Sequence, residues 1–132
     1  MMSHTPRPMA SVEPSRSVAL ADQILTQTYP LVQDPKLLLS VCAQLDAAGQ
    51  TILAQARTRG VPLAIEHTMN IATIHAIMQQ HKDSPLEFRR KENLVICAAD
   101  LRYTLLTQES VKKLLGGIRL ALHDLDNGRI TA

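Results

Sequence analysis

Aromatic residues are scarce in this sequence. Phe, Tyr and Trp make up 2% of its 132 residues, and Trp is absent. A hydrophobic core must therefore be built from Leu, Ile, Val, Ala and Met, several of which are good helix formers. Apolar residues still make up 45% of the chain, which is typical of a globular protein and not of a disordered one. Length and composition together predict a single globular domain.

Cysteine and long apolar runs are also scarce. The sequence has two cysteines, Cys42 and Cys97, and neither belongs to a pair at the spacing of zinc ligands. We expect both to be reduced, buried apolar side chains, and we expect no metal and no cofactor. No apolar run approaches the roughly 20 residues that span a membrane, and the first fifteen residues lack the apolar core of a signal peptide. The sequence therefore predicts a cytoplasmic protein with no membrane partner.

Neither sign of charge is in large excess. The formal net charge is +2, which is too small to be the signature of a nucleic-acid-binding or membrane-binding domain. The first fifteen residues carry three prolines and no apolar run. We therefore expect residues 1–14 to form a disordered tail and residues 15–128 to form a single helical domain.

Apolar residues recur at spacings of three and four residues in four segments, which predicts four amphipathic helices. Asp34 and Thr107 are candidate N-caps, and Gly60 and Gly128 are candidate stops. Pro30 lacks a backbone donor, so it should kink or end the first helix. The expected helices cover residues 15–30, 35–59, 62–81 and 108–127.

A different pattern separates the third and fourth predicted helices. Residues 82–93 are mostly polar and predict a loop, with Leu86 and Phe88 as its anchors. The runs 94–97 and 101–106 are β-branched or alternating, which predicts a two-stranded hairpin. The expected fold class is therefore mainly α: an antiparallel four-helix bundle with a small β-hairpin before the last helix.

Five histidines raise the question of a metal site. His67, His75 and His81 lie eight and six residues apart, which corresponds to about 12 Å and 9 Å along a helix. Metal-binding pairs on a helix are usually three or four residues apart, so we expect surface or boundary side chains. A site assembled across helices or subunits is the alternative. The sequence also lacks serine-nucleophile and phosphate-loop motifs, which favours a protein without catalytic activity.

Basic residues supply the remaining candidates. One group lies in residues 81–91, interleaved with acidic residues, and a second lies on the last predicted helix, where two side chains four residues apart share a face. Either these groups contact phosphates, or they lie in solvent and pair with nearby carboxylates. The candidate anion- or nucleic-acid-contacting residues are Lys82, Arg89, Arg90, Lys91, Arg119 and His123.

Two stretches resemble a known family. Residues 28–39 read TYPLVQDPKLLL and residues 81–97 read HKDSPLEFRRKENLVIC. Both resemble a family of small, mostly archaeal helical proteins of unknown function, which implies a shared fold and no particular activity. The chain is also faintly similar to HEPN domains, which are small helical bundles often linked to RNA cleavage. Active HEPN domains separate Arg and His by four to six residues, whereas Arg119 and His123 have three residues between them.

The sequence favours a non-enzymatic helical module for interaction or oligomerisation, with a second copy or another protein as its partner. The alternative is a HEPN-like protein that is associated with nucleic acid or nucleotides through the basic residues named above. The Gly116-Gly117 pair in the last predicted helix supports the first hypothesis. Each glycine lowers helix stability by roughly 1 kcal/mol relative to Ala, which indicates close packing with another element or a partner.

Overall fold

The computed structural model describes residues 13–84, 86–97 and 102–127, except for the side chains of Leu86 and Phe88. Residues 1–12 of the predicted tail, the anchoring by Leu86 and Phe88, and the stop at Gly128 lie outside the described residues. The predicted tail extended to residue 14, but the first helix already begins at Pro14, which is buried. The described chain is mainly helical, with a small antiparallel sheet. In chain order its elements are α1 (Pro14–Gln23), a π-helical turn (Ile24–Thr28), α2 (Tyr29–Val32), α3 (Lys36–Arg59), α4 (Ile65–Asp83), β1 (Leu86–Arg90), β2 (Asn93–Cys97), β3 (Tyr103–Leu106) and α5 (Gln108–Asp126).

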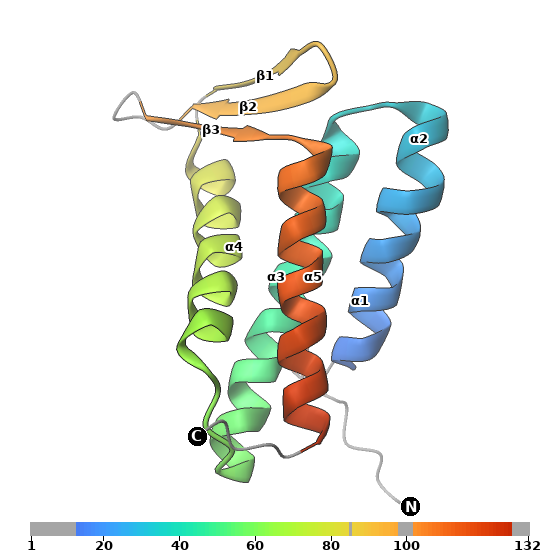
Figure 1. Cartoon of the computed structure of the whole chain (residues 1–132). Coiled ribbons are helices and arrows are strands. Elements are labelled where there is room, and N and C mark those ends of the chain that lie inside the picture. The colour runs from blue at the N-terminus through green and yellow to red at the C-terminus, as the bar shows by residue number, and fades with distance from the viewer. Residues whose placement is uncertain (1–12, 85, 98–101, 128–132) are drawn as a thin grey trace, which may run out of the picture.

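The helices lie side by side and form the body of the molecule, and the sheet covers one end of it (Figure 1). α3 packs against α1, α4 and α5, and α5 in turn packs against α1, α3 and α4. Among the described residues, α3 is also long and apolar enough to cross a membrane by length and composition alone. Half of its most apolar window is buried inside the protein, as in the core helix of a globular domain.

The predicted kink at Pro30 takes the form of the π-helical turn. The backbone N–H of Tyr29 bonds to the carbonyl of Ile24, five residues back, which widens the helix just before the proline. Pro30 then lies in the first turn of α2, where a missing N–H leaves no hydrogen bond unmade. The segment ends at Gln33, which has a left-handed φ of 55°.

Local signals account for the starts of α3 and α5, but not for that of α4. The Asp34 carboxylate accepts a hydrogen bond from the backbone N–H of Lys36 at 3.0 Å, so it caps α3 as expected. Thr107 and Ser110 form a reciprocal capping box at the start of α5, which confirms the predicted cap. α4 begins at Ile65, three residues later than predicted from Pro62.

Two of the glycines that lie within helices allow close packing. A Cβ on Gly49 of α3 would lie 3.0 Å from the Ile71 side chain of α4, and a Cβ on Gly117 of α5 would clash with the Asn70 amide of α4. A Cβ on Gly116 would meet nothing within 4 Å. The close contact expected at the glycine pair therefore involves Gly117 and a helix of the same chain.

The predicted loop over residues 82–93 is wrong. Residues 86–90 form β1, and the sheet has three antiparallel strands in the order β1-β2-β3 instead of the two expected. The β1–β2 connection is a tight turn over Lys91 and Glu92, in which Lys91 has a φ of 57°. Neither residue is typical of such a turn, so no turn signal marks it in the sequence.

Side-chain hydrogen bonds fix the sheet onto the helices. The Gln80 amide of α4 donates to the Ile96 carbonyl of β2 and accepts a hydrogen bond from the Thr104 hydroxyl of β3 at 2.6 Å. The buried Tyr29 hydroxyl donates to the backbone carbonyl of Glu92 at 2.8 Å, which ties the β1–β2 turn to α2. Burial raises the pKa of Tyr29, so this donor stays protonated at neutral pH.

Candidate functional surface

Strand pairing divides the side chains of the sheet between two faces, because successive residues of a strand point in opposite directions. The inner face packs on the helices and includes the buried side chains of Leu94, Ile96 and Leu106. The described side chains of the outer face are those of Arg90, Asn93, Val95, Cys97, Tyr103 and Leu105. Most of the outer face is thus apolar too, although an antiparallel sheet commonly has one polar, solvated face.

A shallow hollow of about 350 Å³ lies on this outer face. The described residues that line it are Arg90, Val95, Cys97, Tyr103 and Leu105. They come from all three strands, so the sheet pairing assembles the hollow. None of these five side chains is acidic, and one of them is a cation. We call this surface the outer sheet face.

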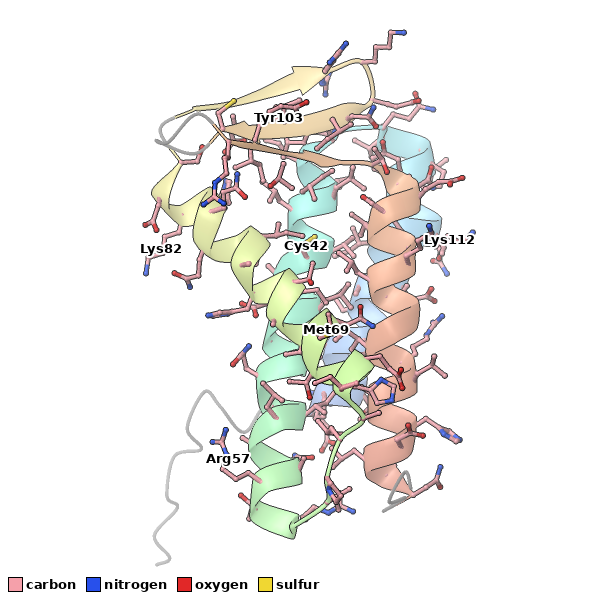
Figure 2. All side chains as sticks on the ribbon, turned by 60° about the vertical axis from the view of Figure 1, so that its left-hand side comes forward. Cys42, Arg57, Met69, Lys82, Tyr103 and Lys112 are labelled. Atoms are coloured by element: carbon pink, nitrogen blue, oxygen red, sulfur yellow. The ribbon has the colours of Figure 1, made fainter. Side chains whose placement is uncertain are left out.

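Two of its apolar side chains are exposed to solvent. Tyr103 is 69% exposed and Leu105 is 41% exposed, whereas Val95 on the central strand β2 is buried. Figure 2 shows Tyr103 at the sheet end of the molecule, far from Arg57 at the opposite end. Exposed apolar residues that are grouped around a hollow are typical of a binding surface, whereas single ones are ordinary.

The two cysteines differ in their surroundings. Both are free thiols. Cys42 is fully buried in α3, and this burial, with a smaller contribution from Asp46, raises its pKa to about 12. Cys97 is partly exposed and lines the hollow, so the prediction that both cysteines are buried is wrong for Cys97. Since the thiolate is the reactive form, Cys97 should react with alkylating reagents far faster than Cys42.

The basic residues predicted as one cluster are separated by the sheet. Arg89 is on the inner face and pairs with the Asp34 carboxylate at 3.5 Å, whereas Arg90 is on the outer face. Lys91 lies in the β1–β2 turn, and Lys82 lies near the end of α4, beyond the opposite end of β1. The four cations therefore do not form a single patch.

Arg119 and His123 lie on a different part of the molecule. Arg119 is about 16 Å along α5 from the sheet end, and its guanidinium pairs with Asp22 of α1 at 3.2 Å. His123 is exposed and contacts Asn127, one turn further along the helix. The structure thus places these two candidate residues apart from those on the sheet.

A buried histidine, His67, lies near the start of α4 and pairs with Asp124 of α5. His67 is 6% exposed, so the expectation of surface or boundary histidines is wrong for this residue. Its Nε2 lies 2.8 Å from the Asp124 carboxylate of α5, and this hydrogen bond lowers the pKa of Asp124. The other ring nitrogen, Nδ1, is buried and has no hydrogen-bond partner among the described residues. The pair links α4 to α5, and in the described part of the chain no three His, Cys, Asp or Glu side chains could hold a metal ion.

Apart from Arg90, the residues of the outer sheet face were not identified from the sequence as a site, although one signal pointed to them. Leu94, Val95, Ile96 and Cys97 form a continuous apolar run in β2. Such a run is typical of a strand covered on both faces, whereas a half-solvated strand alternates apolar and polar residues. The run therefore indicated an apolar outer face once β2 was identified as the central strand.

Comparison with known proteins gave no relative: no protein-family model, no curated protein and no solved structure matches this chain. The resemblances to an archaeal family and to HEPN domains therefore stay predictions.

Proposed function

We propose that this chain is a non-enzymatic interaction module that binds a polypeptide through its outer sheet face. In this proposal the helices form a four-helix bundle that serves as a rigid scaffold, and the β2–β3 hairpin with β1 forms the docking surface. The observation that carries the proposal is the apolar outer sheet face, with Tyr103 69% exposed beside Leu105. Tyr and Arg are enriched among the residues that anchor protein–protein interfaces, and the hollow has one of each.

The alternative of nucleic-acid binding has less support from the same surfaces. Of the candidate cations, Arg89 and Arg119 are paired with Asp34 and Asp22. The described side chains of the hollow include one aromatic residue, Tyr103, whereas single-stranded nucleic acids are usually bound by several stacking rings along a basic groove. Aliphatic side chains such as those of Val95 and Leu105 favour contact with apolar side chains of a protein.

Size-exclusion chromatography with light scattering tests this function. The untagged chain is purified at low salt from the cells that express it naturally, and absorbance is recorded at two wavelengths. We expect a complex heavier than the 14.5 kDa chain, with polypeptide as its added mass and no excess absorbance at 260 nm. Because the chain has no Trp and two Tyr, bound nucleic acid would be conspicuous.

Two double variants locate the contact. Tyr103→Ser with Leu105→Ser should reduce the complex to the monomer. Met69→Ser with Leu120→Ser removes two equally large exposed side chains from α4 and α5, each 62% exposed, and should leave the complex intact. A complex that survives the first double variant, or a salt-sensitive excess of 260 nm absorbance in the wild type, would contradict the proposal.

A further inference from the structure

The ionisable side chains on the inner face of the sheet have partners on other elements. The Glu87 carboxylate of β1 lies 2.7 Å from His81 Nε2, and Arg89 pairs with Asp34. On the outer face, Arg90 makes no ion pair with any described residue and is exposed. Next to it in the chain, Lys91 and Glu92 occupy the exposed β1–β2 turn, where their opposite charges offset each other. Among the described residues that line the hollow, Arg90 is therefore a cation without a matching carboxylate.

From this arrangement we infer that the partner is an acidic segment of another protein, with a large apolar side chain for the hollow and a carboxylate for Arg90. This inference rests on the proposed function and names the chemistry of the partner. An arginine guanidinium binds a carboxylate through two parallel hydrogen bonds, which supplies both orientation and affinity. In this inference the partner's apolar side chain contacts Val95, Tyr103 and Leu105, and the burial of these apolar side chains from water drives the association.

A second copy of this chain fits the surface less well. In a symmetric dimer the same patch lies on both subunits, so the hollow of each copy would offer the Arg90 of the other a cation and no described carboxylate. Like charges facing each other across an interface are unfavourable. A membrane surface also fits less well, because the apolar residues line a hollow, whereas membrane-bound helices bury a protruding apolar face in the lipid.

Cys97 provides a built-in reporter for the test, because it lines the hollow while Cys42 is buried. The rate of Cys97 alkylation by iodoacetamide is measured by mass spectrometry on the full chain. The probes are a short synthetic peptide of Leu and Phe separated by Glu, and the same peptide with every Glu replaced by Lys. We expect the Glu peptide to protect Cys97 at about tenfold lower concentration than the Lys peptide, since a charged hydrogen bond contributes on the order of 1.4 kcal/mol or more.

Charge reversal gives the matched control. In Arg90→Glu the preference should reverse, so that the Lys peptide protects Cys97 better than the Glu peptide. Equal protection by both peptides, or none by either, would overturn the acidic partner while leaving the chromatographic test of the docking function unaffected. Protection that rises with the concentration of the protein itself would indicate a second copy. Stronger protection by anionic vesicles or by an oligonucleotide would also overturn the inference.

Discussion

The two ends of the helical body differ in which side chains they bury. Where α4 begins and α5 ends, the polar His67 is buried against its partner Asp124. At the sheet end, the apolar Tyr103 and Leu105 are exposed. A buried polar group with a partner supports the folded state, whereas grouped apolar residues in water indicate a surface that binds something else. The His67–Asp124 pair thus supports the folded state at one end, and we propose that the hollow with its exposed Tyr103 and Leu105 serves binding at the other.

The largest effect on stability is expected from the inner face of the sheet. Ile96 is fully buried, so Ile96→Ala should lower the free energy of unfolding by about 3 kcal/mol, through lost burial and the cavity left behind. Urea denaturation measures the change. Leu105→Ala, on the outer face of the same sheet, is the matched control and should change it by less than about 1 kcal/mol. Equal losses would remove the distinction between the two faces.

The glycine pair tests the seam between α4 and α5 that connects the two ends. Gly116→Ala should raise the free energy of unfolding by up to about 1 kcal/mol, because Ala favours the helix and the new Cβ meets open space. Gly117→Ala should raise the free energy of unfolding by less than this, or should lower it, because the new Cβ would displace the Asn70 amide. Thermal denaturation of the two variants compares them directly. The opposite order would mean that the two helices do not pack closely at Gly117.

Acid is expected to have a smaller effect on the free energy of unfolding, through the His67–Asp124 pair. The hydrogen bond from His67 lowers the pKa of Asp124 from its ordinary value of 3.8. The stabilisation by this carboxylate is therefore complete above that pH and is lost as the pH falls through the lowered pKa. Urea denaturation at pH 6 and at pH 3 should show a larger acid-induced loss for the wild type than for Asp124→Asn. Identical losses would mean that the pair contributes nothing to pH dependence.

The smallest effect on stability is expected at the outer sheet face. Tyr103→Ser with Leu105→Ser should leave the free energy of unfolding within about 1 kcal/mol of the wild type, because exposed side chains bury little on folding. The same variant should lose its partner in chromatography. A large loss of stability would show that these side chains belong to the core, and the binding account would then fail.

Sequence patterns predicted the helices well because their signals are local. Apolar residues three and four apart, the capping side chain of Thr107 and the N-terminal cap at Asp34 act within a few residues of each other. The sequence predicted that Pro30 kinks or ends the first helix, but not that the turn before it is π-helical. The widened hydrogen bond from Tyr29 to Ile24 depends on how the segment packs. The described helices therefore follow the sequence closely.

The first strand and the outer sheet face depend on contacts between distant residues. β1 contains ionisable side chains, and two of them contact His81 and Asp34 from other elements. Its turn at Lys91 carries no typical turn sequence. Without β1, β2 was predicted as one half of a hairpin and not as a central strand, so the apolar face that it forms with β3 went unrecognised. The burial of His67 likewise depends on Asp124, which is 57 residues away in the chain.

Site-specific photo-crosslinking tests the central claim most directly. The photoreactive residue p-benzoylphenylalanine replaces Tyr103 in the full chain within the cells that express it naturally, and a second protein carries it at Leu120 as the matched control. We predict a discrete crosslink from position 103 to an acidic polypeptide, absent from position 120 and lost when Leu105→Lys is added. The same products from both positions, or a crosslink from position 103 to nucleic acid, would contradict the account.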